Sequence, residues 1–275
     1  MVRTVPLWLR VFFVLNVLQD VALAGGLVVP ESIPFPLTVT PLNARFIGAL
    51  YLASAIGIIL SAIVRNAIDT RIFVVGFGLV SLLVLIVTFL YWGDFTARRV
   101  PVLWLVTYAV DPIVTTATVV ALNLWRPSQP GRHRLSALFL VQFVVLGIVG
   151  LALLLAPDAL AALWPWKISP LLARVYGCFF IAFAVGAWLA SGESRPAAIL
   201  PVTASSFALM AFVIVASALH LARFTPGLPT AIWFGAFGIG AIAFAVALVT
   251  FPWRESAKLG SGLPALPSAA NGEAR

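Results

Sequence analysis

The stretch "TPLNARFIGALYLASAIGIILS" at residues 40–61 decides the fold class of this chain. After Arg45 no charged side chain follows until Arg65, and most residues between them are apolar. The hydrocarbon core of a bilayer is about 30 Å thick and is crossed by roughly 20 apolar residues in a helix. The stretch therefore predicts a membrane-spanning helix over residues 41–63.

The composition extends this prediction to the whole chain of 275 residues. Hydrophobic residues make up 62% and charged residues 9%, and the mean hydropathy is +1.10. Globular chains contain about 45–50% apolar and about 25% charged residues. A soluble protein with so few polar side chains would not cover its surface, so the composition predicts a multi-pass membrane protein. The single cysteine, Cys178, excludes an intramolecular disulfide and a multi-cysteine metal site.

Eight apolar runs are long enough to span a bilayer, and short connectors containing Pro, Gly, Arg or Asp separate them. The period-two alternation of membrane strands is absent, so we predict an all-α polytopic protein. The first run resembles a signal peptide, but Asn16, Gln19 and Asp20 interrupt its apolar region, so we predict a helix there as well. The predicted spans are 8–29, 41–63, 72–92, 101–125, 134–156, 170–191, 199–221 and 229–251.

The opening stretch occurs twice, which predicts a tandem duplication. Ten of 27 positions are identical between residues 35–61 and 164–190, an offset of 129 residues. The same offset carries "DFT" (94–96) onto "RFT" (223–225) and Trp104 onto Trp233. Since each unit holds four spans, the two repeats, 1–130 and 131–253, should share one topology about an axis along the membrane normal.

The charge distribution predicts the orientation. The net charge is +8, but the basic residues lie at the ends of the apolar runs, so we expect the lipid bilayer and not nucleic acid as the partner. With the N-terminus inside, the cytoplasmic side collects ten Arg and Lys against six on the other side. We therefore predict a cell-membrane protein with both termini cytoplasmic and a disordered tail over 254–275.

Small residues recur on one face of the repeated helix. A small-xxx-small stripe lets two helix backbones approach closely within lipid. We therefore predict that the repeated helix is a packing element, and the prolines before it favour a defined helix start. The stripe consists of Ala49, Ala53 and Gly57 in the first repeat and of Cys178, Ala182 and Gly186 in the second.

Two acids lie within the predicted spans. A carboxylate in hydrocarbon costs about 3 kcal/mol on insertion scales, so Asp20 and Asp111 should face the protein interior. The residues on their helix faces form polar stripes that either line a ligand pocket or hydrogen-bond between helices. The candidate ligand-binding or ion-pair residues are Asn16, Gln19, Asp20, Arg45, Thr107, Tyr108, Asp111, Thr115 and Thr118.

The two arginines of the repeat receive different predictions. Arg45 has both acids within reach if its side chain points inward, as an ion pair or a ligand site would require. The second repeat keeps the arginine, but Gly240 stands at the position equivalent to Asp111 and no acid corresponds to Asp20. We therefore predict that Arg174 is an anchor whose guanidinium extends to lipid phosphates.

No catalytic or metal-binding arrangement is present in the sequence. The two histidines, His133 and His220, do not form an HExxH motif or another metal-ligand spacing, and we expect no cofactor. His133 is predicted to be a solvated loop residue, and His220 an interfacial residue at the outer end of its helix.

The pattern "AR-x-x-G-x(6)-A-x-G", at residues 44–57 and 173–186, resembles the start of the second helix in small bacterial membrane proteins of the DoxX-like type. This resemblance implies a four-helix unit in a bacterial inner membrane and carries no catalytic residues. Three functions remain open: binding or transport of a small or lipid-like molecule, a structural or assembly subunit without a ligand, and a lipid-modifying enzyme with Asp20 or Asp111 as acid or base.

Overall fold

The computed structural model describes residues 4–25, 39–96, 102–126, 130–251 and 253, and these ranges contain helices but no strand. The predicted tail 254–275 lies outside them. Eight helices are long and apolar enough to cross a membrane, which confirms an all-α polytopic membrane protein. These helices are α1 (Leu7–Ala24), α2 (Pro41–Ile63), α3 (Arg71–Leu90), α5 (Val102–Ala121), α6 (Ser136–Leu155), α8 (Pro170–Ser191), α9 (Pro196–Ala218) and α10 (Leu228–Thr250).

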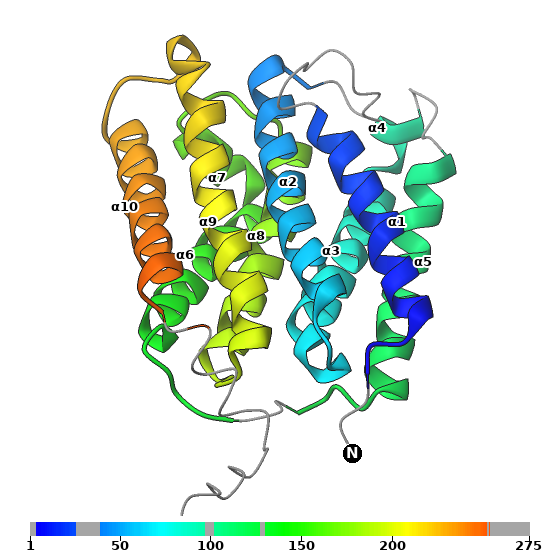
Figure 1. Cartoon of the computed structure of the whole chain (residues 1–275). Helices are drawn as coiled ribbons and strands as arrows, with labels where there is room; N and C mark the ends of the chain where they lie inside the picture. Colours follow the sequence, from blue (N-terminus) through cyan, green and yellow to red (C-terminus); the bar gives the residue numbers. More distant parts are fainter. Residues whose placement is uncertain (1–3, 26–38, 97–101, 127–129, 252, 254–275) are drawn as a thin grey trace, which may run out of the picture.

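Four short helices connect these spans at the ends of the bundle (Figure 1). They are η3 (Ala67–Thr70), α4 (Trp92–Thr96), α7 (Pro157–Leu163) and η4 (Leu221–Arg223).

The repeated stretch begins its helix in the same way in both halves. Thr40 caps α2, because its side chain accepts a hydrogen bond from the backbone N–H of Asn43 at 3.4 Å. Ser169 caps α8 by accepting from Leu172 at 3.2 Å. A proline at the first helical position follows each cap and needs no hydrogen-bond partner there.

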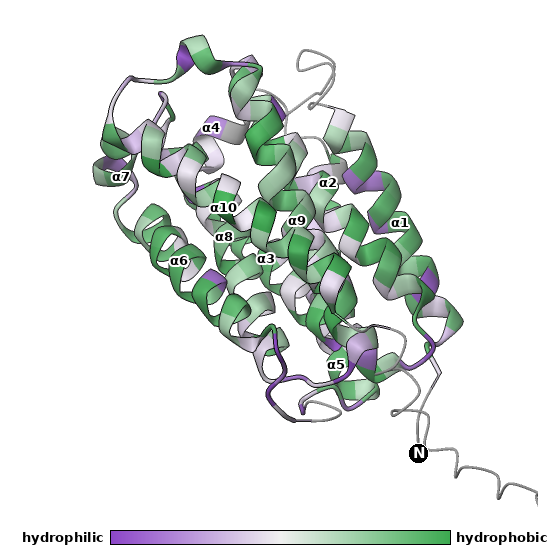
Figure 2. Ribbon diagram, turned by 60° about the vertical axis from the view of Figure 1, so that its left-hand side comes forward, coloured by the Kyte–Doolittle hydropathy of each residue, from purple (hydrophilic) through white to green (hydrophobic). Residues whose placement is uncertain are grey.

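The helices form a central group and an outer group. In α2, α8 and α9, 61% of the residues of the apolar span are buried, against 28% in α1 and α6 and 22% in α10. The exposed side chains of the outer helices are largely apolar, and hydrophilic residues gather toward the helix ends (Figure 2). Because lipid tails are apolar, these outer faces suit contact with the bilayer.

The central helices pack across the two halves of the sequence. The helix α2 packs on α1 and on α9, whereas α8 packs on α6 and on α3. The outer pairs are α3 with α5 and α9 with α10. A shift of 129 residues maps α2 onto α8 and α3 onto α9. Each helix contact made in one half of the chain therefore has an equivalent contact in the other half. The hydrophobic core therefore lies where α2, α3, α8 and α9 meet.

The small-residue stripe lies at close helix contacts, as predicted. The hydroxyl of Ser205 on α9 donates to the carbonyl of Ala53 on α2 at 2.7 Å, which requires that the two helices approach closely. At the related contact, a Cβ added to Gly76 on α3 would lie 3.8 Å from the carbonyl oxygen of Ala182 on α8. Small side chains thus bring the central helices together at both places.

Candidate functional site

The two acids predicted within the spans are both buried inside the first half of the chain. Asp20 on α1 exposes 1% of its surface and Asp111 on α5 exposes 4%. Their carboxyl groups are close enough to interact electrostatically. The fold thus brings together two acids that lie 91 positions apart in the sequence, a juxtaposition that the sequence could not show.

Two serines from the helices between the acids accompany the carboxyl groups. The Ser54 side chain on α2 lies near the carboxyl group of Asp20. The Ser81 hydroxyl on α3 donates to Oδ2 of Asp111 at 3.3 Å. The Oδ2 atom of Asp20 is buried and has no hydrogen-bond partner.

Two tyrosines complete this group, which we call the acid cluster. The hydroxyls of Tyr51 on α2 and Tyr108 on α5 hydrogen-bond to each other, and both lie within electrostatic range of the two acids. The cluster therefore draws on all four spans of the first half. Its members are Asp20, Tyr51, Ser54, Ser81, Tyr108 and Asp111.

Other predicted site residues satisfy their polar groups within their own helices. Thr115 donates to the carbonyl of Asp111 at 2.7 Å, and Thr118 donates to Val114 at 2.6 Å. The Asn16 amide likewise donates to the carbonyl of Phe12 at 2.9 Å. These bonds to the preceding helical turn leave the three side chains outside the acid cluster, although Asn16, Thr115 and Thr118 are buried. The remaining predicted residues, Gln19 and Thr107, are half-buried.

The prediction that Arg45 approaches the acids is wrong. Its Nη1 atom lies 2.6 Å from Nε2 of His220, just beyond the end of α9. Arg45 precedes Ser54 by nine residues, which corresponds to about 13.5 Å along a helix axis. The arginine therefore belongs to the end of the bundle, whereas the acid cluster lies deep between the helices.

The prediction that Arg174 is a lipid anchor is also corrected by the structure. Its guanidinium donates to the Tyr91 hydroxyl and to the carbonyl of Leu154, and its Cζ lies 5.2 Å from the centre of the Tyr91 ring. The offset of 129 residues relates Tyr91 to His220, and Arg45 to Arg174. Each arginine thus binds the ring at the end of the third span of the other half.

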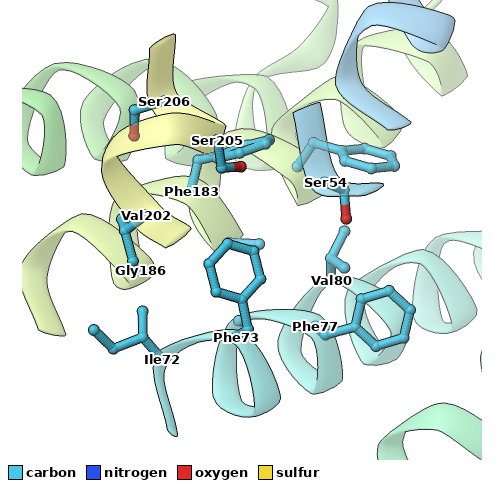
Figure 3. A pocket seen from close by; sticks show the side chains of 13 residues that line it. Ser54, Ile72, Phe73, Phe77, Val80, Phe183, Gly186, Val202, Ser205 and Ser206 are labelled. Atoms are coloured by element: carbon cyan, nitrogen blue, oxygen red, sulfur yellow. The ribbon is translucent and has the colours of Figure 1, made fainter. Parts of the chain in front are cut away.

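A cavity adjoins the acid cluster where α2, α3, α8 and α9 meet (Figure 3). Its volume is about 60 Å³. Its walls are mainly apolar, and the ring of Phe73 points into it. Three hydroxyl side chains also line it, those of Ser54, Ser205 and Ser206. Because Ser54 also neighbours Asp20, this serine joins the cavity to the acid cluster.

The sequence analysis missed Tyr51, Ser54 and Ser81 as parts of the site. Tyr51 and Ser54 lie three residues apart and hence on one face of α2, a spacing that was available as a signal. Ser81 is one of two hydroxyl residues in the apolar run of α3, with Thr88, and its contact with Asp111 identifies it as part of the site.

The described part of the chain holds no group of three His, Cys, Asp or Glu side chains suited to a metal ion. Comparison with protein-family models, with curated proteins and with solved structures finds no match to this chain. The candidate site is therefore defined by its geometry alone.

Proposed function

We propose that this protein binds or transports a small or lipid-like molecule through the polar site of its first half. The observation that carries the proposal is the position of Ser54, which lines the central cavity and neighbours the buried carboxyl of Asp20. A molecule in the cavity would place its apolar part against the Phe73 ring and its polar part toward the acids.

The buried Oδ2 atom of Asp20 has no protein hydrogen-bond partner and is open to a ligand. An unpaired buried acceptor costs about 1–3 kcal/mol, so a donor group that reaches this oxygen would stabilise the complex. Arg45 does not compensate this acid, because its guanidinium is held at His220. A ligand that donates a hydrogen bond or carries positive charge would complete the site.

The duplication and the orientation form part of the same proposal. Matched hydrogen bonds support a tandem repeat: the indole of Trp104 donates to Thr88 at 3.2 Å, and that of Trp233 donates to Ser217 at 2.9 Å. Both partners obey the offset of 129 residues. The N-terminal residues and the end of α10 lie at the same end of the bundle (Figure 1), which accords with two cytoplasmic termini in a bacterial inner membrane.

The test compares Asp20→Asn and Asp111→Asn with Asp158→Asn, which alters an exposed acid on α7. We would measure the apparent Tm of the full chain in detergent, alone and with a panel of membrane lipids and small amphiphiles. We expect a member of the panel to stabilise the parent protein and the Asp158 variant. Neither variant of the acid cluster should respond to that member, because the amide replaces one carboxyl oxygen with an NH₂ group and so changes the hydrogen bonds offered to the ligand.

Ser54→Ala separates ligand binding from folding, because it removes one hydroxyl at the boundary between the cavity and Asp20. It should weaken the response to the stabilising compound while the unliganded Tm changes little. If no panel member stabilises the parent, or if the acid variants only lose Tm in the same proportion with and without ligand, the structural alternative replaces the proposal.

A further inference from the structure

A second pocket lies at the end of the bundle where α2 begins. Its volume is about 370 Å³, and its walls are the helix start 40–42 and the residues Trp166, Lys167, His220 and Arg223. None of the described residues that line it is acidic. This pocket and the acid cluster share no residue.

The positive charge of this pocket comes from two elements. Lys167 precedes α8, whereas Arg223 follows α9. Arg45 adds a guanidinium directly behind His220, with Nη1 2.6 Å from the ring nitrogen. The start of α2 contributes the positive end of the dipole of a 23-residue helix, although Pro41 has no N–H and the N–H of Asn43 is bound by Thr40.

The walls of the pocket are held in place by contacts outside it. The indole of Trp166 donates to Oδ1 of Asn43 at 2.7 Å, and its ring centre lies 5.0 Å from that of Phe224. The backbone N–H of Thr225 donates to the carbonyl of Pro165 at 2.8 Å. The segments that carry Lys167 and Arg223 are thereby tied together, and both residues line the same pocket.

The packing that the two halves have in common does not require positive charge at this pocket. The offset of 129 residues relates His220 to Tyr91 and Arg223 to Asp94, so the corresponding corner of the first half carries a tyrosine and an acid. If the cations served only to hold the helices in place, the equivalent corner would be expected to carry them too. The basic character is therefore specific to one of two related places.

The position of the pocket along the spanning helices indicates the chemistry of its ligand. Thr40 caps one span, Lys167 lies three residues before another, and His220 lies two residues after a third. These positions are at the ends of the spanning helices, where the phosphate groups of lipids lie. Arginine, lysine and a helix start together are a typical phosphate-binding set.

We propose that this pocket binds a phosphate group, carried either by a membrane lipid or by a soluble molecule. Arg223 supplies a planar guanidinium that can donate to two phosphate oxygens, and Lys167 supplies a point charge. The indole of Trp166 forms an apolar wall beside them, which suits the glycerol or acyl part of a lipid.

The test uses the full chain in an uncharged detergent and two probes. One probe is inorganic phosphate, titrated against chloride at constant ionic strength. The other is phosphatidylglycerol in mixed micelles, compared with diacylglycerol of the same chains, which lacks the phosphate. The measured quantity is the apparent Kd from the rise in Tm.

Lys167→Gln and Arg223→Gln should each weaken the apparent affinity about tenfold, because each removes one charge-assisted hydrogen bond. Both side chains are exposed, so the unliganded Tm should remain close to that of the parent. The matched control is the pair Arg65→Gln and Arg126→Gln, which removes two exposed charges at the opposite end of the bundle.

A response to phosphatidylglycerol alone identifies a lipid, and a response to inorganic phosphate identifies a soluble phosphate-bearing ligand. The proposal is overturned if neither probe stabilises the parent more than its control. It is also overturned if the variants at Lys167 and Arg223 respond like the Arg65 and Arg126 pair. Loss of function of the acid cluster would leave these responses unchanged.

Discussion

The contact between α6 and α8 depends on Gly177, and replacing this residue tests the packing directly. A Cβ added at Gly177 would lie 2.9 Å from the carbonyl oxygen of Gly150, 2.9 Å from Cγ of Leu154 and 3.1 Å from Cβ of Leu153. Carbon atoms in contact prefer about 3.5–4.0 Å, so the helices must separate by about 0.5–1 Å. Two of the three atoms belong to backbone or Cβ positions and cannot rotate away.

Gly177→Ala should therefore destabilise the protein relative to Gly186→Ala in the same helix. A Cβ at Gly186 meets its nearest neighbour, Cγ2 of Ile72, at 3.8 Å, which is an ordinary contact. Both substitutions gain the same helix propensity, about 1 kcal/mol, so this gain cancels in the comparison. The difference that remains is the cost of overpacking at Gly177, about 1–3 kcal/mol.

The assay is the apparent Tm of the two variants in one detergent at one heating rate. For a chain of this size about 1 kcal/mol corresponds to about 2–4 °C, so the Tm of Gly177→Ala should lie about 2–12 °C below that of Gly186→Ala. A value for Gly177→Ala equal to or above that of Gly186→Ala would refute the close approach of α6 and α8.

Two further predictions concern the end of the bundle that holds the N-terminus. His133 is half-buried and not solvated as the sequence predicted, and this burial lowers its pKa below the ordinary value. Its Nε2 donates to the carbonyl of Ala190 at 2.9 Å, and its Nδ1 accepts from the N–H of Leu135 at 3.2 Å. The stability that the neutral ring contributes is present above about pH 6.5 and is lost as the pH falls through the pKa of the folded state. Lowering the pH from 7.5 to 5 should therefore lower the Tm of the parent more than the Tm of His133→Gln. An equal fall in Tm for both proteins would contradict this prediction. Asp69→Asn should cost about 2–3 kcal/mol, because it breaks the paired bonds of 2.6 and 2.8 Å to a partly buried Arg195. Asp69→Asn should lower the Tm less in an Arg195→Gln background than in the parent, and full additivity of the two changes would show that the pair is not coupled.

The membrane fold was predictable because its signal is local. Runs such as 41–63 contain enough apolar residues to cross a bilayer, and no distant contact is needed to recognise them. The caps at Thr40 and Ser169 are local as well, since each binds a backbone N–H three residues further on. The predicted spans therefore agree with the observed helices within a few residues at most ends.

The burial of Asp20 and Asp111 was also predictable, because a carboxylate facing lipid is costly wherever the helix lies. Their partners were not. The contact of Ser81 with Asp111 depends on which face of α3 meets α5. Ser81 and Thr88, seven residues apart, mark that face, but the sequence does not state which helix it meets.

The two arginines show where local reasoning failed. Arg45 and Arg174 were assigned different roles because only the first half contains the acids, yet both bind rings contributed by the other half. A long side chain at a helix end can turn toward several neighbours, and the sequence does not state which helix lies beside it.

By itself the sequence determined that this chain crosses a membrane about eight times, that its second and sixth spans begin alike, and that two acids must avoid lipid. Only the tertiary structure decided that Asp20 meets Ser54 beside a cavity, that the arginines cross between the halves, and that Lys167 and Arg223 converge on one pocket. The physical reason is that transfer into a bilayer depends on the composition of each segment, whereas a site depends on how helix faces meet.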